Sequence, residues 1–350
     1  MSTIRPSKLR KIIDQFSDPT ILVIGDVILD SYVWGKVERI CPEAPVPVVE
    51  VQKETYMLGG AANVVRNLRT LGADVYLSGV VGSDYPSKII YEELESIHVN
   101  AEGLVSDNNR PTTKKTRVVA GHQQVVRFDH ETKAVISEET FQKHLAFIQK
   151  NWECFDAIIV SDYGKGLVTE ALLKELRKLQ AKNKKWISVD PKERNMPYYK
   201  GVSLVTPNQK EAAFAAGKQI ETEQDLKEVG RKIMHQLGCE NLVVTLGSQG
   251  MALFQKGGEF LKVPTFAKEV FDVSGAGDTV IATLTLAVSC GATLSEAVAL
   301  ANYAAGVVVG KLGTAAVSAM ELKKYIETEK NRVSKRHLTY QSPLPSRLSS

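Results

Sequence analysis

The sequence predicts an α/β fold in which a mainly parallel sheet is covered by helices on both faces. Short apolar runs rich in β-branched residues recur along the chain and carry no polar alternation, as expected for buried strands. Helix patterns separate several of these runs, which is typical of parallel strands joined by crossover helices. A chain of 350 residues, of which 43% are hydrophobic, can bury a large core.

The first expected strand is TILVIGDV, at residues 20–27. Similar strands are expected at 74–82, 156–163, 185–191, 203–208 and 241–247, and helices at 87–97, 169–182 and 225–238. Ligands bind such a sheet at the C-terminal ends of its strands. The residues that fall at these ends are Asp26, Asp162, Asp190, Asn208 and Gly247.

Two stretches, at 33–52 and 112–129, have the pattern of antiparallel strands with no helix between them. They form either a small second sheet over one end of the main sheet or an addition to its edge. The sequence favours neither arrangement over the other.

Composition and termini limit the class of protein. A net charge of +4 is too small to indicate a nucleic-acid partner, and no apolar run is long enough for a membrane span. The four cysteines form no CxxC pair, so we expect reduced thiols and a cytoplasmic protein. The N-terminus predicts a short amphipathic helix. Residues 1–327 are expected to form the folded domain, and residues 328–350 a disordered tail rich in Pro, Ser and Arg.

The stretch DVSGAGDTVIAT, at 272–283, places Gly275, Ala276 and Gly277 directly before Asp278 and a helix. Free amides at a helix N-terminus bind anions such as phosphate oxygens. A carboxylate beside them can take the proton of a hydroxyl that attacks a phosphoryl group. Alternatively, Asp278 only caps the helix.

Three further turns bear on this choice. Gly59 and Gly60 precede Asn63 and a helix, which suits either close approach of a hydroxyl-rich ligand or a tight turn. Asn208 and Glu211 suit a hydrated Mg²⁺ that carries phosphates, or a helix cap. The turn TLGSQG, from Thr245 to Gly250, suits a nucleotide.

Two other nucleotide motifs are absent from the sequence. GDVILD does not match the dinucleotide fingerprint G-x-G-x-x-G. GVVVGKLG is not a Walker A loop, because its spacer is one residue short and it lacks the Ser or Thr that would hold Mg²⁺.

In order, LGGAANVVRNL, TPNQKEA, TLGSQG and DVSGAGDTVIAT resemble the ribokinase/PfkB carbohydrate kinase family, from about residue 20 to 327. Within it, GDVILDSYVWGKVERICPEAPVPVVEV, SDYGKG and DPK are most similar to the D-glycero-β-D-manno-heptose 7-phosphate kinases. The resemblance implies a three-layer α/β/α ribokinase-like sandwich with a small β lid over the sugar. It also implies transfer of the γ-phosphoryl of ATP to the anomeric O1, for ADP-heptose and lipopolysaccharide core synthesis.

The resemblance also implies roles for individual residues. Asp278 is the base, and Gly275, Ala276 and Gly277 form the anion hole. Asn208 and Glu211 hold Mg²⁺ and phosphate, whereas Thr245, Gly247, Gly250 and Asn302 bind ATP. The sugar is expected at Asp30, Gly59, Gly60 and Asn63. A cation for the 7-phosphate is expected among Arg117, Arg127, Lys165 and Lys192.

A monovalent cation and a homodimer formed through the lid are further expectations from the resemblance. The alternatives are another sugar or sugar-phosphate kinase of the family, acting on ribose, fructose or a fructose phosphate, and a non-catalytic sugar-phosphate sensor. The presence of Asp278 argues against a sensor. A nicotinamide dehydrogenase is disfavoured because its fingerprint is missing.

Overall fold

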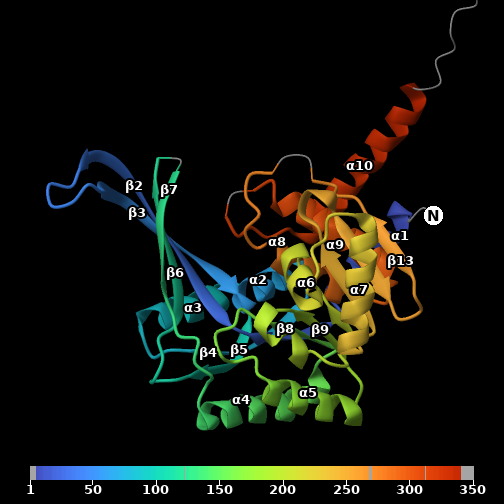
Figure 1. Cartoon of the computed structure of the whole chain (residues 1–350), viewed down its shortest axis with the longest axis horizontal. Helices are drawn as coiled ribbons and strands as arrows, with labels where there is room; N and C mark the ends of the chain where they lie inside the picture. Colours follow the sequence, from blue (N-terminus) through green and yellow to red (C-terminus); the bar gives the residue numbers. More distant parts are fainter. Residues whose placement is uncertain (1–4, 122, 268–269, 312, 340–350) are drawn as a thin grey trace, which may run out of the picture.

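The structure, a computed structural model, describes residues 5–121, 123–267, 270–311 and 313–339. A nine-stranded sheet forms the centre of this part of the chain (Figure 1). Its strands are β1 (Thr20–Gly25), β4 (Asp74–Val81), β5 (Asn100–Ser106), β8 (Ala157–Ser161), β9 (Trp186–Asp190), β10 (Leu204–Val205), β11 (Asn241–Thr245), β12 (Met251–Gln255) and β13 (Phe260–Val263). Their order is β13-β12-β11-β10-β9-β8-β1-β4-β5. Only β12 pairs antiparallel with its neighbours, which confirms the expected mainly parallel sheet.

Strand β10 is shorter than expected, with two residues against the predicted stretch 203–208. Pro207 follows it and cannot donate to a strand ladder, and Asn208 already begins the next helix. The other predicted strands and helices of the main body lie within about two residues of their expected bounds.

Alternate residues of the central strands point into two separate cores. Ile21 and Val23 of β1 pack in one core, and Leu22 and Ile24 in the other. On the first face lie α1 (Pro6–Asp14), α2 (Ala61–Leu71), α3 (Tyr85–Ser96), α8 (Ala276–Ser289), α9 (Leu294–Val308) and α10 (Ala319–Thr339). On the second lie α4 (Glu138–Asn151), α5 (Glu170–Lys182), α6 (Gln209–Ala216) and α7 (Glu223–Leu237). The expected three layers are confirmed.

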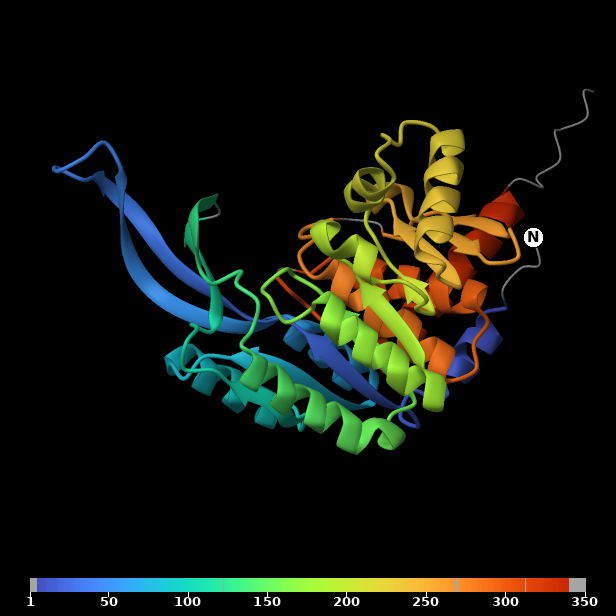
Figure 2. The same cartoon turned by 60° about the horizontal axis from the view of Figure 1, so that its bottom comes forward.

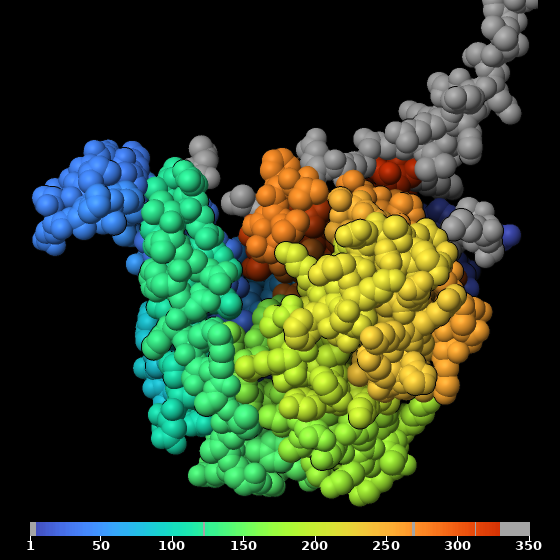
Figure 3. Space-filling model, in the orientation of Figure 1, coloured from blue at the N-terminus to red at the C-terminus, as the bar shows by residue number. Residues whose placement is uncertain are grey.

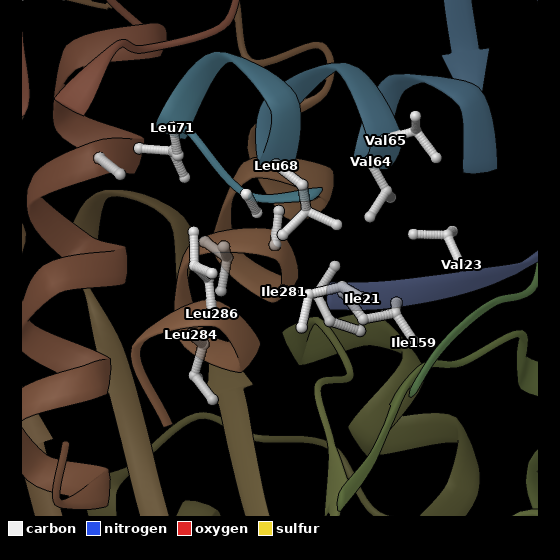
Figure 4. Close-up of a cluster of buried hydrophobic side chains, with 14 of the residues drawn as sticks. Ile21, Val23, Val64, Val65, Leu68, Leu71, Ile159, Ile281, Leu284 and Leu286 are labelled. Carbon is white, nitrogen blue, oxygen red and sulfur yellow. The ribbon is translucent and has the colours of Figure 1, made fainter. Parts of the chain in front are cut away.

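Helices α2 and α8 pack against each other over the middle of the sheet. In Figure 4, apolar side chains from both helices and from the strands beneath them face one another. Leu68 of α2 and Ile281 of α8 are fully buried there, above Ile21 of β1. Because protein cores are close-packed, this cluster fixes how the N-termini of α2 and α8 lie relative to each other.

The remaining strands form a separate four-stranded sheet that projects from the main body and that we call the lid (Figures 1 and 2). Its order is β3 (Pro47–Gly60), β2 (Val27–Ile40), β6 (Thr113–Ala120) and β7 (Gln123–His130). Of the two arrangements left open by the sequence, the structure has the second sheet. The two antiparallel hairpins are joined through β2 and β6, which run parallel, and this pairing was not predicted.

The expected disordered tail from residue 328 stays a prediction, and the described chain continues as a helix past that point. Helix α10 continues to Thr339, and residues 340–350 lie outside the described residues. The apolar pattern does end near residue 328, but the chain there is rich in Glu, Lys and Arg, which favour helix without tertiary packing. Across the described ranges, no helix is both long and apolar enough to span a bilayer.

Candidate active site

Asp278 lies in the first turn of α8, at the C-terminal edge of the sheet. Gly275 is the N-cap and has a φ of +76°, a conformation that glycine adopts without strain. The carboxylate of Asp278 is buried and accepts two hydrogen bonds from other elements. Asn63 Nδ2 donates to Oδ2 at 2.6 Å, and the Tyr163 hydroxyl donates to Oδ1 at 2.7 Å.

These contacts decide between the two expectations for Asp278. A capping residue accepts from backbone amides of its own helix, whereas the carboxylate of Asp278 is held by side chains from α2 and from the loop after β8. Burial raises the pKa of Asp278 to about 6, although the hydrogen bonds from Asn63 and Tyr163 lower it. Asp278 is therefore a buried carboxylate with a proton affinity close to neutral pH, and not a simple cap.

Tyr163 was not among the predicted site residues, although the motif SDYGKG that contains it was noted. Its loop is tied to the sheet by two carboxylates at strand ends. Asp26 Oδ2 accepts from the amides of Tyr163 and Lys165, each at 2.9 Å, and Asp162 Oδ1 accepts from the amide of Gly164 at 2.7 Å. No sequence spacing relates Tyr163 to Asp278, because 115 residues separate them.

Asn63 has a different environment from the one expected. It is fully buried in α2, and its Oδ1 accepts from Arg66 Nη2 at 2.9 Å while its Nδ2 holds Asp278. A Cβ at Gly275 would lie 2.7 Å from Asn63 Nδ2, so only glycine allows this close approach. Thr279 of α8 adds a hydrogen bond of 2.8 Å to Asn67 of α2. Asn63 thus joins the two helix N-termini.

Asp30, Gly59 and Gly60 lie together at the base of the lid. Asp30 is buried, and its Oδ1 forms an ion pair with Arg117 Nη1 at 2.5 Å. A Cβ at Gly59 would lie 2.2 Å from Asp30 Oδ2, and Gly60 has a φ of +56° as the N-cap of α2. The two glycines are therefore required by the protein itself, for the position of Asp30 and for the strand-to-helix turn.

A cavity of about 280 Å³ lies between the N-terminus of α8, α9 and the turn after β11, and we call it the α8–α9 cavity. Thr245, Gly247, Gly250 and Asn302 all line it, as do Ala276 and Gly277 of the glycine turn. The Asn302 side chain donates to the carbonyl of Pro264 at 2.6 Å. Every residue expected at the nucleotide from TLGSQG, together with Asn302, is brought to one cavity.

A second cavity of about 210 Å³, the Asn208 cavity, adjoins the first, because Thr245 and Gly277 line both. Its other walls include Asn208, Glu211 and Lys192, together with Asp162, Tyr163 and Asp190. Asn208 and Glu211 form a capping box at the start of α6, so the capping geometry is present. Asn208 and Glu211 nevertheless line this cavity together with Asp162 and Asp190, and side chains with oxygen ligands suit Mg²⁺. Within the described ranges, no three His, Cys, Asp or Glu residues cluster closely enough to hold a metal ion by themselves.

Three of the four basic candidates lie on or beside the lid, and Lys192 does not. Arg117 and Arg127 are paired opposite one another on β6 and β7, and Arg127 contacts Asp129 at 3.0 Å. Lys165 is buried and contacts Glu131 at 2.5 Å. Figure 3 shows the surface hollowed between the lid strands β6 and β7 and the orange segment beside α8.

The position of Gly59 generates a test of this geometry. Gly59→Ala is expected to displace the Asp30 carboxylate and lower the free energy of unfolding by about 1–3 kcal/mol, as overpacking does. Gly257→Ala is the matched control, because its Cβ would meet nothing within 4 Å and its φ is not positive. Urea unfolding near neutral pH measures the free energy of unfolding of both variants. Equal stability of the two would contradict the assignment of Gly59 to the close approach of Asp30.

Comparisons with known proteins agree with this architecture. A family model described as pfkB family carbohydrate kinase matches residues 18–321. A "Bifunctional protein HldE" from Desulfatibacillum aliphaticivorans is 47% identical over 90% of this chain and 64% of its own length. Another from Wolinella succinogenes is 43% identical over 89% of this chain and 65% of its own length. The chain thus spans slightly less than two thirds of these relatives.

Two solved structures show the same fold at low identity. Arabidopsis thaliana ribokinase complexed with ribose and ATP superposes with a TM-score of 0.70 at 20% identity, covering 88% of this chain and 99% of that chain. Escherichia coli phosphofructokinase-2 in complex with fructose-6-phosphate superposes with a TM-score of 0.72 at 18% identity, covering 89% of this chain and 99% of that chain. With a family match over most of its length, this chain belongs to the pfkB family of carbohydrate kinases.

Proposed function

We propose that the chain is an ATP-dependent kinase that phosphorylates the anomeric O1 of D-glycero-D-manno-heptose 7-phosphate to give the 1,7-bisphosphate. One observation carries the kinase assignment. Gly277 lines both the α8–α9 cavity and the Asn208 cavity, and it directly precedes the buried Asp278. A nucleotide in these cavities would present its terminal phosphate to the start of α8, beside that carboxylate.

The residues at the start of α8 supply base and anion hole. Near neutral pH most of Asp278 is ionised, because its pKa is about 6, and it accepts the proton of the attacking hydroxyl. The first amides of a helix have no partner within it, so those of Gly275, Ala276 and Gly277 are proposed to stabilise charge on the transferred phosphoryl group. The amide of Ala276 would do so in exchange for its 3.2 Å contact with the carbonyl of Val273. Burial of the site strengthens both effects, since the local dielectric is low.

ATP is proposed to place its adenosine in the α8–α9 cavity, beside Gly247, Gly250 and Asn302, with its phosphates reaching the Asn208 cavity. Asn208 and Glu211 would hold Mg²⁺, directly or through water. When bound, the ion would neutralise charge on the phosphates. Lys192 lines the Asn208 cavity, so we assign it to the phosphates of ATP in preference to the 7-phosphate. The requirement for a monovalent cation stays a prediction from the family resemblance.

The choice of sugar rests on similarity over the chain. Relatives named HldE are 41–47% identical over 86–90% of this chain, and the N-terminal segment resembles heptose 7-phosphate kinases. The sugar is proposed to lie between Asp30, the Gly59–Gly60 turn and Asp278. Arg117, Arg127 and Lys165 are cations on or beside the lid and suit a phosphomonoester. The chain covers 64–65% of the first of these relatives, so the proposal concerns the kinase reaction alone.

The lid is proposed to pair two copies of the chain. Apolar side chains are unusually exposed on it, with 62% of Ile40 and 53% of Phe128 accessible, although strands of a single domain normally bury such residues.

The four cysteines are free, which fits a reducing compartment, and we place the enzyme in the cytoplasm.

Replacing Ile40 and Phe128 by Asp together is expected to convert the dimer to a monomer, because charge at a buried interface is costly. Light scattering coupled to size exclusion measures the mass. Met320→Asp is the control, since Met320 is 78% exposed and lies on α10, away from the lid. A wild-type monomer, or a dimer that survives both lid substitutions, would contradict the proposal.

The proposed activity is tested by ADP release with Mg-ATP and a panel of sugars. The panel contains D-glycero-D-manno-heptose 7-phosphate, sedoheptulose 7-phosphate, fructose 6-phosphate and ribose. Turnover is expected with the first only. Efficient turnover of another sugar would leave the kinase chemistry standing and overturn the substrate.

Asp278→Asn is expected to bind ATP normally and to lose turnover by about 10²–10⁴-fold, because general-base catalysis is typically of that size. Equilibrium binding of an ATP analogue verifies that the variant keeps its site. Near-normal turnover would return Asp278 to a purely structural role.

A further inference from the structure

We propose that Tyr163 is a positioning residue for the base, which orients the Asp278 carboxylate and keeps it ionised while its own phenol stays protonated. The inference rests on the proposed function for its kinetic test, but not for its geometry. Nothing in the glycine turn itself holds this carboxylate. The described contacts of Asp278 come from Asn63 on one oxygen and from Tyr163 on the other.

The two donors leave one orientation for the carboxylate. Asn63 contacts Oδ2 at 2.6 Å and Tyr163 contacts Oδ1 at 2.7 Å, so rotation of the carboxylate would break both contacts. A carboxylate oxygen can accept two hydrogen bonds, and each oxygen of Asp278 keeps capacity for an acceptor hydroxyl. Tyr163 thus fixes the orientation of the Asp278 carboxylate and leaves it able to accept a hydrogen bond from the acceptor hydroxyl.

Backbone hydrogen bonds also hold the loop that carries Tyr163. Its amide donates to Asp26 at 2.9 Å, and the neighbouring amide of Gly164 donates to Asp162 at 2.7 Å. Asp162 is buried and also accepts from the Tyr199 hydroxyl at 2.5 Å. The loop after β8 is therefore pinned to the C-terminal ends of two strands, and the phenol extends from it to Asp278.

Tyr163 also lines the Asn208 cavity, which is the space proposed for the phosphates of ATP. It therefore lies where the base and the phosphoryl group would meet.

In the reaction, the acceptor oxygen bonds to the γ-phosphorus while the bond from that phosphorus to the β–γ bridging oxygen breaks. The electron pair of the broken bond leaves with ADP. The proton of the acceptor hydroxyl moves to Asp278, and Tyr163 keeps its own proton.

The charges around the site explain why a donor is needed. Asp30 of β2 and Asp190 of β9 lie near enough to Asp278 to interact unfavourably with its charge, and Arg66 of α2 offsets them in part. Burial and the nearby Asp278 raise the pKa of Tyr163 well above 10, so the phenol is a donor and not a second base. Because a donor favours the charged form of an acid, loss of the phenol should raise the pKa of Asp278.

Tyr163→Phe tests this with little change in volume. In the wild type, kcat/KM is expected to fall below about pH 6, where Asp278 gains a proton. In Tyr163→Phe this acidic limb should move up by about one pH unit, since a hydrogen bond to a charged group corresponds to roughly ten-fold or more in the proton equilibrium. Tyr76→Phe is the control, because Tyr76 of β4 packs against Phe155, lies in the N-terminal half of its strand and should leave the limb unchanged.

A second readout needs no turnover. In protein labelled with ¹³C at the aspartate carboxyls, the midpoint of the Asp278 resonance should rise by a similar amount in Tyr163→Phe, without Mg²⁺ or substrate. The resonance is assigned by its absence in Asp278→Asn. If no sugar is phosphorylated by the wild type, the proposed function fails, and this titration still decides the role of Tyr163. An unchanged midpoint overturns the proposal, including when Tyr163→Phe lowers the melting temperature, because the phenol would then be only structural.

Discussion

The burial of one carboxylate, Asp278, is the constraint on which the rest of the site depends. Moving a charge out of water is costly unless hydrogen bonds compensate for it. The compensation here comes from Asn63 in α2 and Tyr163 in the loop after β8, 215 and 115 residues away in the sequence. Three separate parts of the chain must therefore be correctly placed before the base can exist.

The fold supplies that placement through packing and glycine. The apolar cluster shared by α2 and α8 brings their N-termini together, and Gly275 lets the turn approach Asn63. At the base of the lid, Gly59 leaves room for Asp30, and the lid itself continues directly from β1 through Asp26. Asp26 also holds the loop that carries Tyr163, so the same strand end orients both the lid and the loop. A substitution at one of these residues would therefore disturb more than one part of the site.

Much of this arrangement could be predicted from local pattern. Buried strands and crossover helices have strong sequence signals, so the sheet, both helical layers and the position of Asp278 at the start of a helix followed from the sequence. The glycine turns at Gly60 and Gly275 were also correctly placed, because a positive φ leaves a clear mark in sequence. The extent of α10 to Thr339 did not follow from the sequence, since charged residues can extend a helix that apolar periodicity no longer marks.

The remaining features could not be predicted because they depend on contacts between distant parts of the chain. The place of Asn63 at the sugar stays a prediction, whereas its hydrogen bond to Asp278 was not foreseen. Gly59 was attributed to a ligand, whereas the clash that forbids a side chain there is with Asp30. Tyr163 lies in the noted motif SDYGKG but was given no role, because a tyrosine in a loop resembles any other until the partner of its hydroxyl is known.

The most direct test of the central claim is a crystal structure with a non-hydrolysable ATP analogue and the sugar phosphate bound together. We expect the acceptor hydroxyl within hydrogen-bonding distance of Asp278, the terminal phosphate on the amides of Gly275 to Gly277, and the contacts from Asn63 and Tyr163 intact. A sugar hydroxyl out of reach of Asp278, with the nucleotide outside the α8–α9 cavity, would contradict it.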